Sequence, residues 1–180
     1  NKRRERIEDL DRLPFPDYSL VRLNLYNEFL LSKPFAVIQT ARGCPFECNY
    51  CVRTYGKKIT YRSIESVINE LKKLKSDFNI ATVRFIDDTF TVNKERAKRL
   101  CQRITEEEIE IKWSSLNRAD TLDKEAIQLM KRAGCVRIYV GVESGSQKIL
   151  DFYHKGYKLE AIKAQIKMVK DSGIEAAAFF

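Results

Sequence analysis

The chain has 180 residues, of which 44% are hydrophobic, and a formal net charge of +8. This length supports one domain with a substantial core and is too short for two large ones. The charged N-terminal stretch does not resemble a secretory signal peptide, and the apolar runs are too short for a membrane span, so we expect a cytoplasmic protein. Lys and Arg are spread over segments with helical patterns, which indicates solvated helix faces and leaves an RNA partner or an anionic substrate open.

The N-terminal segment contains two Pro residues within the stretch LPFPDYSL, residues 13–20. Each Pro also restricts the residue before it, so the stretch predicts an extended linker. We assign residues 1–33 to this linker and residues 34–180 to the folded domain. The sequence begins with Asn and ends in the apolar run GIEAAAFF. We therefore expect both ends to lie inside a longer chain.

Short β-rich runs alternate with amphipathic helices along the rest of the sequence. The first three helices have N-cap residues at Ser63, Asn93 and Asp123. Gly134 stands where the third helix should end, and Gly173 where the fourth should end. The predicted strands cover residues 35–40, 81–87, 111–117, 136–143 and 174–180.

This alternation of strands and helices predicts an α/β fold with parallel strands and right-handed crossovers. Both an open doubly wound sheet and a (β/α) barrel satisfy the pattern. Five units with the last one ending in mid-strand favour part of a TIM-like barrel, truncated at about the fifth strand. Most strands close on polar residues, and in such folds the carboxyl ends of the strands carry the ligand site.

Three of the five cysteines lie in one loop directly after the first predicted strand. Cys44, Cys48 and Cys51 have the spacing C-x3-C-x2-C, which places three thiolates around one iron–sulfur cluster. Structural zinc needs a fourth ligand at a matching spacing, and the sequence has none nearby. Cys101 and Cys135 are interpreted as small buried hydrophobic residues. His154, the only histidine, is interpreted as a surface or capping residue.

With Tyr50 just before the last cysteine, this motif resembles the signature of the radical S-adenosylmethionine (SAM) superfamily. The similarity continues through FIDDTFTVN, NRADTL and AGCVRIYVGVESGSQKIL, and it covers nearly the whole chain from residue 13 onward. These stretches look like the subgroup whose members often carry an N-terminal cobalamin-binding domain. The resemblance implies that Cys44, Cys48 and Cys51 hold a [4Fe–4S] cluster and that SAM occupies the open iron.

The resemblance also implies roles at the strand ends. Asp87 and Asp88 match the position that binds the SAM amino group, although the glycines usual there are missing, and an exposed acidic turn is the alternative. Glu143 and Ser144 match the ribose-contacting position, and the alternative for Glu143 is a cap for a short helix near Ser146. These assignments follow the order of the strands.

Arg118 and Tyr50 complete the set of expected cofactor-binding residues. A guanidinium fork suits the SAM carboxylate, but an ion pair of Arg118 with Asp120 or Asp88 fits the sequence nearly as well. Tyr50 belongs to the cysteine motif itself.

The resemblance implies reductive cleavage of SAM to methionine and a 5′-deoxyadenosyl radical, with electrons from a donor such as flavodoxin or ferredoxin. Cobalamin-dependent methyl transfer through an upstream domain is one implied reaction, and methylthiotransferase-like modification of RNA or protein is another. A non-catalytic iron–sulfur module for electron transfer and a zinc-bearing RNA-binding domain are the alternatives from other classes. The first would need a fourth cysteine ligand and the second another Cys or His pair.

Overall fold

A computed structural model describes residues 5–26, 33–52 and 54–180. Its centre is a five-stranded parallel sheet with the order β1-β4-β5-β6-β7. Every predicted strand is present, within two residues of its predicted start and up to two residues shorter at its end. The strands are β1 (Phe35–Ile38), β4 (Thr82–Phe85), β5 (Lys112–Asn117), β6 (Cys135–Gly141) and β7 (Glu175–Phe179).

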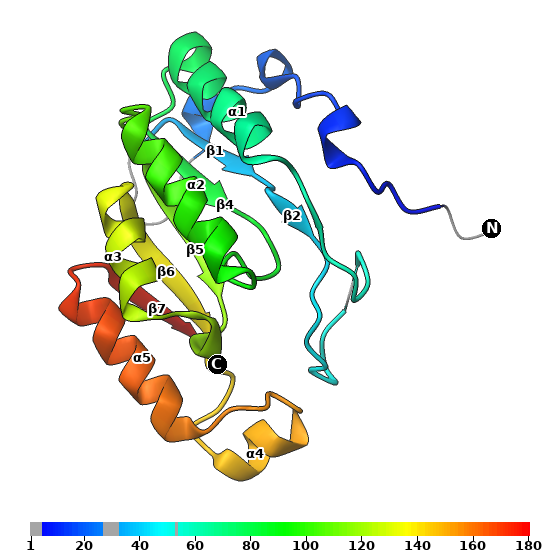
Figure 1. The fold of residues 1–180 in the computed structure, drawn as a ribbon, viewed down its shortest axis with the longest axis vertical. Coiled ribbons are helices and arrows are strands. Elements are labelled where there is room, and N and C mark those ends of the chain that lie inside the picture. Colours follow the sequence, from blue (N-terminus) through cyan, green and yellow to red (C-terminus); the bar gives the residue numbers. More distant parts are fainter. Residues whose placement is uncertain (1–4, 27–32, 53) are drawn as a thin grey trace.

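The strand order decides between the two architectures that the sequence allowed. Each crossover adds its strand on the same side of the sheet, and the order never reverses as it does in a doubly wound sheet. Four crossover helices lie along one face of the sheet (Figure 1). The structure therefore confirms a partial (β/α) barrel. These helices are α1 (Ile64–Phe78), α2 (Lys94–Glu106), α3 (Lys124–Arg132) and α5 (Leu159–Asp171).

The predicted helix caps are confirmed. The side chains of Ser63, Asn93 and Asp123 each accept a hydrogen bond from the backbone N–H three residues later. Each bond satisfies an N–H that has no partner inside the helix. Gly134 and Gly173 follow α3 and α5 with φ of +93° and +74°, a conformation that favours glycine.

The core lies between the sheet and these helices. Trp113 on β5 is fully buried, and its ring packs against Phe85 and Phe90 with centroid distances of 5.2 and 5.4 Å. Its indole Nε1 donates to the carbonyl oxygen of Ala133 at 2.7 Å. Packing on the helix side thus fixes how the strands sit, and hence where their carboxyl ends lie.

The N-terminal segment agrees only in part with the extended linker that the sequence predicted, because the backbone is extended at Leu13 and Asp17, on either side of the two Pro residues, but not throughout. It forms three short 3-10 turns, η1 (Leu10–Arg12), η2 (Tyr18–Leu20) and η3 (Leu23–Leu25). Leu10 and Tyr18 are buried, and the Tyr18 hydroxyl donates to Glu70 on α1 at 2.6 Å. Burial of these two side chains thus fixes the segment against the domain, while the Pro residues lie in the extended stretch between η1 and η2. Residues 1–4 and 27–32 of the predicted linker lie outside the described part of the chain.

Two short elements near the functional edge were not predicted. β2 (Ala41–Arg42) and β3 (Thr60–Tyr61) pair antiparallel and close the neck of the cysteine loop. The loop extends from this neck toward α4 (Gln147–Phe152) (Figure 1). In the described residues, every helix is too short or too polar to cross a membrane.

Candidate functional site

The start of the cysteine loop is held by a buried carboxylate. Asp87, just after β4, is 2% exposed and accepts hydrogen bonds from the backbone N–H of Thr40 at 2.6 Å and of Ala41 at 2.9 Å. The Thr40 hydroxyl donates to the same carboxylate at 2.5 Å, and Arg96 donates to that hydroxyl oxygen at 3.2 Å. Burial raises the pKa of Asp87, although these hydrogen bonds act in the opposite direction.

The neighbouring carboxylate faces the other way. Asp88 is exposed at the carboxyl edge of the sheet, and the Thr89 hydroxyl donates to its backbone carbonyl oxygen at 2.7 Å. The sequence predicted the same role for both acids, contact with the SAM amino group. The structure engages Asp87 with the turn at residues 40–41 and leaves Asp88 at the edge, where a ligand can reach it.

The three loop cysteines form no disulfide and differ in exposure. Cys48 is buried, Cys44 is partly buried and Cys51 is exposed. The loop is tied to the end of α4, because the backbone N–H of Asn49 donates to the carbonyl oxygen of Tyr153 at 3.2 Å and its side-chain amide donates to that of Phe152 at 2.6 Å. These bonds place the loop tip beside the segment that follows β6.

The chemistry of this donor set fits an iron–sulfur cluster. Three thiols on one loop, none of them in a disulfide, can supply the ligands for three irons of a cubane cluster. In the described part of the chain, no three Cys, His, Asp or Glu side chains are gathered closely enough to share a single metal ion. A cubane cluster takes one thiolate per iron, so the loop offers the right ligands in number and type.

Arg118, after β5, joins the loop to the sheet edge. Its Nε and Nη2 donate to the two carboxylate oxygens of Asp120, both at 2.9 Å, and its Nη1 lies 3.4 Å from the Cys48 sulfur. The guanidinium also stacks on the Phe46 ring, with its central carbon 3.7 Å from the ring centroid. Burial lowers the pKa of Arg118, but the hydrogen bonds and charge of Asp120 outweigh it and raise the pKa. The fork is therefore occupied by Asp120, the alternative that the sequence left open.

A second polar group lies at the end of β6. Lys155 is 4% exposed, and its Nζ donates to the Tyr50 hydroxyl and to Glu143 Oε1, both at 3.2 Å. Burial, followed by the hydrogen bond and charge of Glu143, raises the pKa of Tyr50. Residues from the cysteine loop, from the end of β6 and from the turn after α4 thus converge here.

The backbone around Glu143 is shaped for this contact. Glu143 has a φ of +66°, which a residue with a side chain rarely adopts. A Cβ atom on Gly141 would lie 2.6 Å from Glu143 Oε1, so a side chain there would displace the carboxylate from its present position. Strained conformations of this kind persist where the surroundings hold them and often mark functional sites.

The remaining predicted residues have local roles. The Ser144 hydroxyl oxygen accepts from the backbone N–H of Ser146 at 3.1 Å and so shapes the turn before α4. Cys101 and Cys135 are buried, as predicted, and burial raises the pKa of both thiols. His154 is exposed with a φ of +55° in the turn after α4, which agrees with its interpretation as a surface residue.

Sequence reasoning missed Lys155 and Phe46. Lys155 follows an amphipathic helix in a charged stretch, where a lysine ordinarily lies in solvent. The left-handed backbone of His154 turns the chain so that Lys155 points inward while Phe152 is exposed. The one indication in the sequence was that Lys155 lies near Glu143 along the chain, a residue to which the family resemblance assigns a role.

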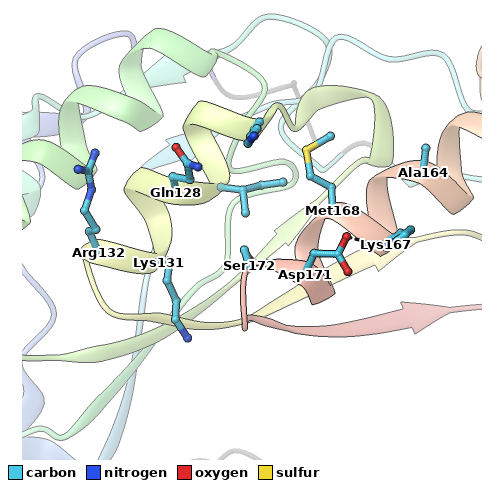
Figure 2. A pocket seen from close by; sticks show the side chains of 10 residues that line it. Gln128, Lys131, Arg132, Ala164, Lys167, Met168, Asp171 and Ser172 are labelled. Atoms are coloured by element: carbon cyan, nitrogen blue, oxygen red, sulfur yellow. Dashed lines mark hydrogen bonds and ion pairs between the residues drawn. The ribbon is translucent and has the colours of Figure 1, made fainter.

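A cavity of about 770 Å³ opens between α3 and α5. Side chains such as Gln128, Arg132 and Met168 line it (Figure 2). It lies in the helical layer and contains none of the predicted site residues. The carboxyl edge of the sheet, where the loop thiols and the polar side chains converge, is therefore the candidate site.

The profile of the Radical SAM superfamily matches residues 38–180 of this sequence, which spans the partial barrel from the last residue of β1 onward. The chain belongs to the radical SAM superfamily, a class of enzymes. This assignment favours the enzyme interpretation over the two alternatives, an electron-transfer module and a zinc-bearing RNA-binding domain.

Among similar proteins, an uncharacterized methyltransferase of Pyrococcus horikoshii is 36% identical over 176 residues, or 97% of this chain and 38% of that protein. The anaerobic magnesium-protoporphyrin IX monomethyl ester cyclase of Rubrivivax gelatinosus is 27% identical over 97% of this chain and 32% of its own length. The chain thus spans between about a third and two fifths of these relatives.

Solved structures share the fold. The radical SAM methyltransferase TsrM from Kitasatospora setae, with tryptophan and a SAM analogue bound, has a TM-score of 0.74 at 22% identity over 80% of this chain and 30% of its own. The cobalamin-dependent SAM radical enzyme OxsB, with aqua-cobalamin and SAM bound, has a TM-score of 0.69 at 25% identity over 79% of this chain and 23% of its own. Both agree with the partial barrel described above.

Proposed function

We propose that this chain is the part of a radical SAM enzyme that holds a [4Fe–4S] cluster and SAM at the carboxyl edge of the sheet. The observation that carries the proposal is the convergence of Cys48 and Tyr50 with Arg118, Glu143 and Lys155, which come from one loop, from the ends of two neighbouring strands and from the turn after α4. The chemistry that a bound cluster supplies is one-electron reductive cleavage of SAM to methionine and a 5′-deoxyadenosyl radical.

In this proposal the loop thiols ligate the cluster and Arg118 supports it. The guanidinium stacks on Phe46 and reaches the sulfur of Cys48, so it fixes the middle of the loop. Arg118 therefore holds the Cys48 sulfur at the sheet edge, where the cluster would bind.

The second polar group provides contacts of opposite sign for SAM. Lys155 presents a buried ammonium, which suits the SAM carboxylate and replaces the role predicted for Arg118. Glu143 offers an acceptor for the ribose hydroxyls, and exposed Asp88 offers one for the amino group. Asp87 acts on SAM through the loop alone, because its carboxylate is engaged with Thr40 and Ala41.

The relatives support methyl transfer as the net reaction. The Pyrococcus protein is described as a methyltransferase and OxsB as cobalamin-dependent. We infer that the whole protein uses cobalamin through a further domain and receives electrons from a donor such as flavodoxin or ferredoxin.

Anaerobic reconstitution with iron and sulfide, followed by metal analysis and EPR of the reduced protein with and without SAM, tests the proposal. We expect about four irons per chain and an EPR signal that changes when SAM is added, because one iron has no protein ligand. Zinc uptake in place of iron, or a spectrum that SAM does not change, would contradict it.

A further inference from the structure

One arginine of the N-terminal segment contacts both sides of the cysteine loop at its neck. We define the neck as β2, β3 and the loop residues next to them, 41–43 and 54–61. The β2–β3 ladder contains only two residue pairs, Ala41 with Tyr61 and Arg42 with Thr60. A ladder this short is weak in isolation, so other contacts must hold the two limbs of the loop together.

Arg6 supplies such contacts. Its Nη2 donates to the carbonyl oxygen of Arg42 at 3.3 Å on the outgoing limb and to that of Lys58 at 2.5 Å on the returning limb. Its Nη1 donates to the carbonyl oxygen of Tyr55 at 2.6 Å, and its Nε and Nη2 reach the Thr60 hydroxyl oxygen at 3.0 and 2.7 Å. The planar guanidinium thus bridges the limbs with donors in a fixed arrangement.

The neck is tightly packed around the same carbonyl group. A Cβ atom on Gly43 would lie 2.1 Å from the Lys58 carbonyl oxygen, so the limbs approach more closely than a side chain allows. The backbone N–H of Cys44 donates to the carbonyl oxygen of Gly56 at 3.1 Å. Glu8 adds an ion pair with the Lys58 side chain at 2.6 Å. The position of Cys44 is therefore linked to the returning limb that Arg6 binds.

We propose that Arg6 is a positioning residue for the iron–sulfur cluster, because it clamps the neck of the cysteine loop before the cluster binds. This inference rests on the proposed function. The three loop cysteines all lie between the two limbs that Arg6 joins, so order in the neck also restricts the loop that carries the thiols. A fixed neck reduces the conformational freedom that the loop loses on binding and so strengthens retention of the cluster.

The test compares the native 180-residue chain with Arg6→Gln and Arg6→Lys. Arg12→Gln is the matched control, because Arg12 is exposed in η1 of the same segment. Hydrogen–deuterium exchange of the metal-free proteins reports on residues 43–59, and iron release to a chelator after anaerobic reconstitution reports on cluster retention. Circular dichroism verifies that each variant is folded.

We expect Arg6→Gln to raise exchange in the loop about tenfold, because a set of charge-assisted hydrogen bonds is lost. It should also release iron about tenfold faster, in step with the gain in loop freedom. Arg6→Lys should show smaller increases in loop exchange and in iron release than Arg6→Gln, since a point charge reaches one limb but cannot bridge two. Arg12→Gln should behave like the native chain.

Loop exchange in Arg6→Gln equal to that in the native chain would overturn the clamp. Faster exchange with unchanged iron release would overturn its role in cluster positioning. Failure of the native chain to take up iron would overturn the proposed function, and with it the cluster role of Arg6. That result is distinguishable from a failed clamp, because exchange is measured without metal.

Discussion

The helix-facing layer of the sheet and its carboxyl edge are built from different kinds of contact. The layer is formed by apolar side chains such as Phe85 and Trp113, both fully buried, from strands and helices with regular periodicity. The edge buries charged groups, among them Asp87, Arg118 and Lys155, on turns and loops. Each of these three has hydrogen-bonding partners, as buried charges require.

The difference separates what stabilises the fold from what prepares the site. Burial of apolar surface favours folding wherever the packing is close, whereas a buried ion pair contributes little net stability after its desolvation cost. The edge groups are instead arranged around one loop. Substitutions in the two regions should therefore have separable effects, on unfolding in one case and on cluster and SAM binding in the other.

The sharpest separation is expected between two cysteines. Cys48→Ser should reduce the iron bound after anaerobic reconstitution from about four per chain to near zero, because the cluster loses one of three protein ligands. Urea unfolding of the metal-free protein should remain close to that of the native chain.

Cys101→Ala is the matched control for the cluster experiment. Cys101 is fully buried on α2, and burial raises the pKa of its thiol to about 12, which keeps it protonated and unreactive. Its replacement should leave the iron content unchanged. Equal iron loss in both variants would remove the distinction between the two regions.

Trp113→Ala should produce the largest change in folding stability. Loss of the indole leaves a cavity beside Phe85 and Phe90 and removes the hydrogen bond to the Ala133 carbonyl. We expect the free energy of unfolding in urea to fall by about 3–5 kcal/mol. Lys112→Ala, an exposed neighbour on β5, should change it by less than about 0.5 kcal/mol. If Trp113→Ala were as stable as the native chain, Trp113 would not be a central residue of the core.

Asp87→Asn and Asp88→Asn test whether two adjacent acids act in different regions. In Asp87→Asn the amide oxygen can still accept from the backbone N–H groups of Thr40 and Ala41, but an NH2 group replaces the oxygen that accepts from the Thr40 hydroxyl, and the charge near Arg96 is lost, which should cost about 1–3 kcal/mol of stability. Asp88→Asn should leave stability within about 0.5 kcal/mol, because the side chain is exposed. Its effect should appear as weaker SAM binding to the reconstituted protein. The reverse result would contradict the assigned positions.

Sequence patterns were sufficient for the regular layer and insufficient for the edge. Strand periodicity and the caps at Ser63, Asn93 and Asp123 depend on neighbours within a few residues, so they are visible in the sequence. The contacts of Arg6 with Lys58, or of Lys155 with Tyr50, join residues 52 and 105 positions apart. The resemblance to a family, taken motif by motif, could assign these residues to the carboxyl edge of the sheet. It could not predict that Asp87 is buried and Asp88 exposed.

Lys155→Met should give the smallest effect of the four and would sharpen the comparison most within the edge. The substitution keeps the length of the side chain and removes the ammonium that lies beside Tyr50 and Glu143. We expect the dissociation constant for SAM, measured by titration of the reconstituted protein, to rise roughly tenfold, as loss of one charge-assisted contact implies. Lys158→Met, at an exposed neighbouring position, is the control and should bind SAM like the native chain. Iron content should be the same in both variants, so that a change in affinity reports on SAM itself. Equal affinities in the two variants would show that Lys155 does not bind SAM. The SAM carboxylate would then have to contact another cation at the edge.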